Sequence, residues 1–171
     1  MRARRQPRAA TVEAIVAEIK NALGDEWLPR IYRERVRAQR TRACSLPAVA
    51  RGNKRVEIQH TLLGVELKVG RRRVHCPDLA TARYLATFAR LGCKSVAVPY
   101  DITRISRLAD DLESAFHRLL LLTEHMTEGR GTVFRRSVRA RLLGDARREI
   151  EEIGAGPSAP QFNQTTRQRG G

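Results

Sequence analysis

The sequence is poor in the residues that cross-link a chain. It has three cysteines among 171 residues, and Cys44, Cys76 and Cys93 are widely spaced with no CxxC pair. An odd number of scattered cysteines does not build a disulfide framework, so the fold has to be held by a packed core. We therefore expect reduced thiols in a cytoplasmic protein.

Long hydrophobic runs are also absent. The longest run is LLLL at 119–122, whereas a membrane-spanning helix requires about 20 apolar residues. The chain starts with the basic segment MRARRQPRAA, and no apolar segment follows it as one would in a secretory signal. We expect an intracellular protein that has no contact with membranes.

The signatures of common catalytic and cofactor sites are missing as well. There is no Walker loop, no GxSxG elbow, no GxxG clamp and no aromatic RRM motif. The histidines and cysteines lack the spacing of a zinc finger, and neighbours on a strand, such as His75 and Cys76, point to opposite faces. The sequence therefore predicts no nucleophile, no metal site and no cofactor.

What the sequence has in excess is positive charge. It holds 33 Lys and Arg against 18 Asp and Glu, a net charge of +15, and 29 of the basic residues are arginine. Residues 1–73 carry a net charge of +11, and residues 74–171 carry +4. Such a surplus favours a nucleic-acid partner, because binding to closely spaced phosphates releases counterions. Arginine also forms paired hydrogen bonds with phosphate and stacks on bases.

The arginines occur in clusters. Four lie at 1–10, a segment with too few apolar residues to pack, which we expect to be a flexible basic arm. Four more fall on one side of an amphipathic helix, opposite Trp27 and Ile31. Others lie in a loop at 51–55, at a turn at 71–73 and in the last helix. The residues predicted to bind nucleic acid are Arg2, Arg4, Arg5, Arg8, Arg30, Arg33, Arg37, Arg40, Arg51, Lys54, Arg55, Arg71, Arg72, Arg73, Arg135, Arg136 and Arg139.

Periodicity and capping signals predict an α+β fold. It consists of a small antiparallel three-stranded meander plus a fourth strand, packed with helices, with helical extensions at both ends. No period is visible at 41–54, and we expect a loop there. The predicted helices cover 12–23, 29–40, 79–91, 102–128 and 132–152, and the predicted strands cover 56–61, 65–69, 74–76 and 94–99.

This pattern divides the chain into five parts. They are a basic flexible arm at 1–10, an N-terminal helical pair and loop at 11–50, an α+β core ending in a long helix at 51–128, a C-terminal basic helix at 129–153 and a disordered tail at 154–171. The long helix, 102–128, is apolar all round near LLLL. We expect that end to contact another helix, a partner protein or a second copy of the chain.

The stretch GVELKVG at 64–70 raises a catalytic alternative. Glu66 and Lys68 are two residues apart on a predicted strand, so their side chains share a face. They resemble the ExK half of the D…(D/E)xK nucleases, in which acids hold a divalent metal and the lysine acts on water. The resemblance makes Glu57 the second acid and Mg²⁺ or Mn²⁺ the cofactor. An ordinary hairpin with an exposed polar face carries the same alternation of Glu and Lys.

Three strands followed by a helix also resemble, in layout alone, double-stranded RNA-binding domains and small sheet domains that enter the DNA major groove. That resemblance implies backbone contacts by the arginines at 71–73. The sequence thus predicts a protein that binds RNA or DNA, chiefly at phosphates, as a component of a nucleoprotein assembly. The alternatives are the metal-dependent nuclease and a protein-binding adaptor.

Overall fold

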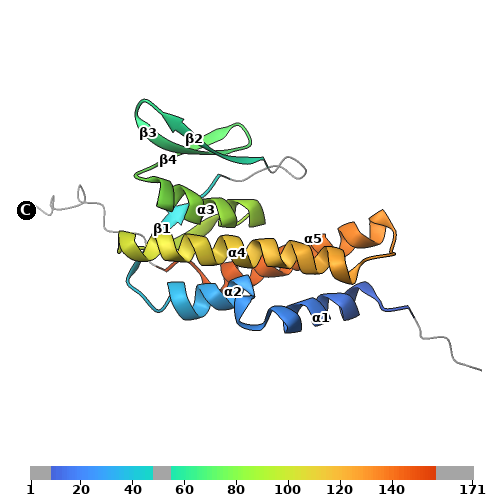
Figure 1. Ribbon diagram of the computed structural model, residues 1–171. Coiled ribbons are helices and arrows are strands. Elements are labelled where there is room, and N and C mark those ends of the chain that lie inside the picture. Colours follow the sequence, from blue (N-terminus) through green and yellow to red (C-terminus); the bar gives the residue numbers. More distant parts are fainter. Residues whose placement is uncertain (1–8, 48–54, 157–171) are drawn as a thin grey trace, which may run out of the picture.

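Helices alternate with two small antiparallel sheets in the computed structural model, which describes residues 9–47 and 55–156 (Figure 1). This arrangement confirms the predicted α+β class with helical ends. The elements, in chain order, are α1 (Val12–Leu23), η1 (Gly24–Glu26), α2 (Leu28–Ile31), η2 (Tyr32–Val36), β1 (Thr41–Ser45), β2 (Val56–Thr61), β3 (Gly64–Val69), β4 (Arg72–Cys76), α3 (Leu79–Leu91), β5 (Ser95–Pro99), α4 (Ile102–Met126) and α5 (Thr132–Ile153).

The sheet β2–β3–β4 is the predicted three-stranded meander. Its strands pair antiparallel, with Val56 opposite Val69 and Val65 opposite Cys76. Alternate residues of a strand point to the same face, and on the inner face Leu67 and Val69 are buried. This face lies on α3, which separates the meander from α4 (Figure 1). The opposite face carries the polar residues of the strands.

The fourth predicted strand does not join the meander. It is β5, and it pairs antiparallel with β1 in a separate sheet in which Cys44 lies opposite Val96. The expectation of a loop over 41–54 is therefore wrong for Thr41–Ser45, and 48–54 lie outside the described residues. The segment TRACS is short and without alternation, so its strand conformation depends on pairing with a distant segment rather than on a local pattern.

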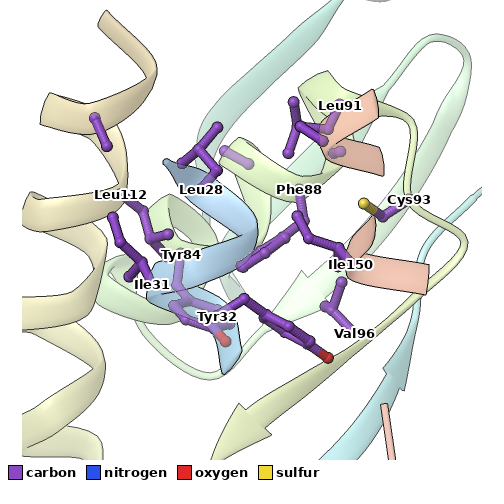
Figure 2. Packing of buried hydrophobic residues seen from close by; sticks show 14 of the residues in the cluster. Leu28, Ile31, Tyr32, Tyr84, Phe88, Leu91, Cys93, Val96, Leu112 and Ile150 are labelled. Carbon is purple, nitrogen blue, oxygen red and sulfur yellow. The ribbon is translucent and has the colours of Figure 1, made fainter. Parts of the chain in front are cut away.

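Three buried rings join the N-terminal helices to α3 and β5 (Figure 2). The ring of Phe88 lies 5.6 Å from that of Tyr32 and 5.1 Å from that of Tyr84, between centroids. The Ala97 N–H donates to the Tyr32 hydroxyl at 2.9 Å, and the Tyr84 hydroxyl donates to the Ala97 carbonyl at 2.6 Å. Burial raises the pKa of both tyrosines, so both hydroxyls stay protonated at neutral pH.

The second helix is shorter than the sequence predicts. It starts with Pro29 in its first turn, as expected, but after Ile31 it widens into the π-helical turn η2. Arg37 closes this turn by donating its N–H to the Tyr32 carbonyl at 2.9 Å. The predicted helix over 29–40 is therefore wrong beyond Arg37. Arg40 lies in the connection to β1, so the four predicted arginines do not form one ridge.

The end of α5 is fixed to the N-terminal region by polar contacts. The Lys20 ammonium donates to Asp145 Oδ2 at 2.8 Å, and the Trp27 Nε1–H donates to Glu149 Oε2 at 2.7 Å. Both pairs join segments far apart in the sequence. They set which side of α5 faces the core, and so they also set which side faces outward.

The apolar end of α4 is covered mainly by its own chain. Leu119 is buried, Leu120 and Leu122 pack against the core, and Leu121 is 52% exposed. The helices α1 and α5 lie beside this end (Figure 1). Contact with a partner protein or a second copy through it stays a prediction. In the described ranges no helix combines the length and apolar character required to cross a bilayer.

Candidate functional site

One face of α5 carries arginines beside small and apolar residues. Each of its members has another member three or four residues away, which places them on one side of a helix; they are Arg136, Arg139, Ala140, Leu143 and Arg147. The buried residues of α5 occupy an adjacent side; they are Val138, Leu142, Asp145, Ala146 and Ile150. The contacts that bury the second side thus hold the first side at the surface.

Two adjoining hollows lie along this outward face. The larger has a volume of about 480 Å³ and is lined by Leu91, Arg136, Arg139, Ala140, Leu143, Gly144 and Arg147. The smaller has a volume of about 230 Å³, lies between α4 and α5, and is lined by Leu120, Thr123, Glu124, Thr132, Arg135, Arg136 and Arg139. Arg136 and Arg139 belong to both linings. We call the two hollows together the α5 groove.

The α5 groove is strongly basic. Four arginines line it, together with a single carboxylate, Glu124. Within residues 9–47 and 55–156, no acid lies at ion-pair distance from any of the four, which are Arg135, Arg136, Arg139 and Arg147. Cations held together in this way repel one another, and a bound anion relieves that repulsion.

Two other arginines of α5, on a different side of the helix, are paired with an acid. Arg141 Nε lies 3.3 Å from Asp145 Oδ1, and Arg148 also donates to that oxygen. Burial acts to raise the pKa of Asp145, but the hydrogen bond from Lys20 and the charges of Lys20, Arg148 and Arg141 outweigh it, and the pKa is lowered. Asp145 is therefore a structural anion that joins α1 to α5.

The first two arginines predicted on the second helix differ in their surroundings. Arg30 contacts Asp25 and Glu34, each at 3.0 Å. The hydrogen bond to Glu34, then the charges of both acids, raise the pKa of Arg30. Arg33 is exposed, and its side chain has no hydrogen bond or ion pair with another described residue. Arg33 is thus available to an external anion, whereas Arg30 already has acidic partners.

The other two arginines of this predicted ridge make contacts within the chain. The Arg37 guanidinium donates to Thr41 Oγ1 at 3.1 Å and to the Ala155 carbonyl at 3.3 Å, which joins the end of η2 to the end of α5. The Arg40 guanidinium lies 5.3 Å from the ring centroid of Tyr100. Both arginines therefore contribute to the fold.

The meander carries a second group of exposed arginines. Arg55, Arg71 and Arg72 are exposed and form no ion pair with the described residues. Arg73 contacts Glu66 across β3 and β4, at 3.5 Å. Three of these four predicted residues are thus open to an anion.

The residues of the nuclease alternative share the polar face of the meander. Glu57 lies opposite Lys68, and Glu66 lies opposite His75. Glu66 also contacts Arg73, so each acid has a basic neighbour across the strands. No cluster of three or more His, Cys, Asp or Glu side chains suited to a metal ion is found in the described ranges. The structure therefore places Glu57, Glu66 and Lys68 on one face, where acidic and basic side chains lie opposite one another across the strands.

The cysteines are held in the fold as thiols. None of the three, all of which the structure describes, forms a disulfide bond. Burial is the main cause that raises the pKa of Cys44 and of Cys76. Because the thiolate is the reactive form, both are weak nucleophiles at neutral pH.

Some predicted residues cannot be placed. Those that lie outside the described ranges are Arg2, Arg4, Arg5, Arg8, Arg51 and Lys54. The structure brings together Arg135, Arg136 and Arg139. It places Arg30, Arg33 and Arg37 on the second helix or at its end, Arg40 in the connection to β1, and the other four on or beside the meander.

Of the residues that line the α5 groove, only Arg135, Arg136 and Arg139 were predicted from the sequence, and Arg147 and Gly144 are among those that were not. Arg147 follows Arg139 by two helical turns, so a continued helical spacing would have found it. No local signal indicates the role of Gly144, because the larger hollow depends on Leu91, which belongs to another helix.

Comparisons of the chain with protein-family models, with curated proteins and with solved structures found no match in any of the three.

Proposed function

We propose that the protein binds nucleic acid and that the α5 groove is its principal contact surface. The observation that carries the proposal is the gathering of four arginines around two adjoining hollows, without an acid at ion-pair distance among the described residues. Guanidinium groups form charge-assisted, often paired hydrogen bonds with phosphate oxygens. A polyanion of regular charge spacing is the partner that satisfies several such groups at once.

The open arginines elsewhere act as secondary contacts in this proposal. Arg33, Arg55, Arg71 and Arg72 add positive charge that is not neutralised by a described acid. Phosphate contacts give affinity and orientation with little choice of sequence. We extend the proposal to a component of a nucleoprotein assembly, in which RNA or DNA is held rather than read.

The test is an affinity titration against salt, using fluorescence anisotropy of labelled single-stranded and duplex oligonucleotides. The slope of log K against log salt measures the number of neutralised phosphates. For the variant R136A/R139A we expect a slope smaller by about two than that of the wild type.

The matched control is R104A/R118A, which removes the same charge from arginines that contact Asp101 and Glu26. We expect it to keep the wild-type slope to within about half a contact. Equal losses in both variants would show a diffuse charge effect and would contradict the assignment to the α5 groove. Absence of binding at low salt would reject the proposal itself and leave a protein-binding adaptor.

The nuclease alternative also has to be tested, since Glu57, Glu66 and Lys68 share one face of the meander. The same oligonucleotides serve for this test. Mg²⁺ or Mn²⁺ is added to the bound oligonucleotide, with E66A as the variant. Metal-dependent products that disappear in E66A would establish cleavage. Intact oligonucleotide with unchanged affinity would leave the meander as a scaffold.

A further inference from the structure

A glycine, Gly144, lies in the middle of α5 and lines the larger hollow. Gly144 is helical, and glycine inside a helix is less favourable than alanine by about 1 kcal/mol. The usual structural reason for such a glycine is close packing against another element. That reason does not apply here, because a Cβ added at Gly144 would meet no atom within 4 Å.

The space left open by Gly144 has a mixed lining. Leu91, Ala140 and Leu143 form its apolar part, and three arginines surround them; the arginines are Arg136, Arg139 and Arg147. Its volume of about 480 Å³ lies in the range of pockets that take small organic groups, roughly 300–1,000 Å³. A surface that bound only phosphates would need the arginines and would gain nothing from an apolar hollow.

An apolar hollow surrounded by arginines suits single-stranded nucleic acid better than a duplex. In a duplex the bases are paired and stacked, so the protein meets phosphates and groove edges. In a single strand the bases are free to enter an apolar hollow and to stack on guanidinium planes. The backbone phosphates then remain beside the same arginines.

We propose that the hollow at Gly144 takes an unpaired base of a single-stranded nucleic acid, whose flanking phosphates contact Arg136, Arg139 and Arg147. The inference rests on the proposed nucleic-acid binding and adds the class of ligand. In this proposal Gly144 leaves free the space that the base occupies, which a side chain at this position would fill.

The test fills the hollow without removing charge. The variant is G144L, and its matched control is G131L, a glycine of the same helix that caps its start and whose added Cβ also meets no atom within 4 Å. The probes are a labelled oligothymidine of about 12 nucleotides, its duplex with oligoadenosine, and a polyglutamate peptide of similar charge. Thermal unfolding checks that each variant is folded, and we expect G144L to be at least as stable as the wild type.

We expect the wild type to prefer the single strand over the duplex. G144L should weaken single-strand binding about tenfold, the contribution of one stacked base, and leave duplex binding unchanged. G131L should leave both unchanged. If G144L bound the single strand and the duplex with the same affinities as the wild type, this inference would be overturned and the proposed function would stand.

Two further outcomes would also overturn the inference. Loss of duplex and single-strand affinity by the same factor in G144L would show that the hollow contributes to phosphate contacts alone. Tight binding of polyglutamate that is lost in G144L would assign the hollow to an acidic protein. If no nucleic acid bound to the wild type at low salt, the proposed function would fail as well.

Discussion

The arginines of the second helix and those of α5 look alike in the sequence and differ in the folded protein. Arg30 contacts two acids, and Arg37 donates to a carbonyl and a hydroxyl of its own chain. Arg136 and Arg139 instead line two adjoining hollows, with no acid at ion-pair distance in the described ranges. Arg30 and Arg37 are thus held by contacts within the chain, whereas Arg136 and Arg139 are open to a ligand.

The difference shows that clustering of charge is a weaker guide to a binding surface than the absence of partners. An arginine already paired with a carboxylate has to break that contact before it binds phosphate. An arginine without such a partner forms the phosphate contact without first breaking another ion pair. We therefore propose α5, rather than the second helix, as the surface that binds the polyanion.

The largest effect is expected from giving the α5 arginines an acidic partner. Ala140 is exposed and lies one turn from Arg136 and beside Arg139. In A140E the new carboxylate pairs with these arginines and repels phosphate, so we expect affinity for nucleic acid to fall on the order of 100-fold. Fluorescence anisotropy at fixed salt measures the change.

A140Q has nearly the same size without the charge and serves as the control for A140E. We expect it to lose less than about threefold in affinity. An equal loss in both variants would attribute the effect to crowding of the groove and would remove the electrostatic part of the account.

A smaller effect is expected on stability from the paired side of α5. The pKa of Asp145 is lower in the folded chain than its ordinary value of 3.8, so its ionised form stabilises the fold at pH above 3.8. This contribution is lost as the pH falls through the folded pKa. We expect D145N to lower the free energy of unfolding by about 2 kcal/mol at pH 7.

Urea unfolding at pH 7 and near pH 3 measures this difference between D145N and the wild type. It should shrink as the pH falls below 3.8, because the carboxylate of the unfolded chain then takes up a proton more readily than that of the folded chain. E152Q, which removes an exposed acid that forms no ion pair with a described residue, is the control and should change stability by less than about 0.5 kcal/mol at either pH. A difference for D145N that is the same at both pH values would contradict the role of the charge.

The smallest effect is expected at Arg37. Loss of its hydrogen bonds to Thr41 and Ala155 in R37A should lower the free energy of unfolding by about 1.5 kcal/mol, with affinity for nucleic acid changed by less than about threefold. The control is R33A, which removes an exposed arginine and should leave stability unchanged. A loss of affinity in R37A that exceeds that of R136A would reverse the comparison.

Much of the fold was predictable because its signals are local. Thr11, Asp78 and Asp101 cap helices through side-chain oxygens that accept backbone N–H groups, and Gly24 and Gly92 follow helix ends. The alternation of apolar and polar residues over 56–61 and 65–69 indicated the strands of the meander. The strand β1 was missed because TRACS has no period of its own and becomes a strand only by pairing with β5.

The site was predictable only in part because pairing of charges is a tertiary property. The sequence indicated Arg135, Arg136 and Arg139, but it did not show that no described acid lies at ion-pair distance from these three. Arg35, for example, contacts Asp111 on a distant helix, and spacing along the chain does not reveal such a contact. The hollow itself requires Leu91 from α3 beside α5, which no local pattern encodes.

The central claim, that nucleic acid lies along α5, is tested most directly by photocrosslinking. A single-stranded oligonucleotide carrying photoreactive bases is bound, irradiated and digested, and the crosslinked peptides are identified. We expect crosslinks in Thr132–Ile153 and at the end of α3 near Leu91. Crosslinks confined to the segment 28–45, with none in α5, would contradict the account.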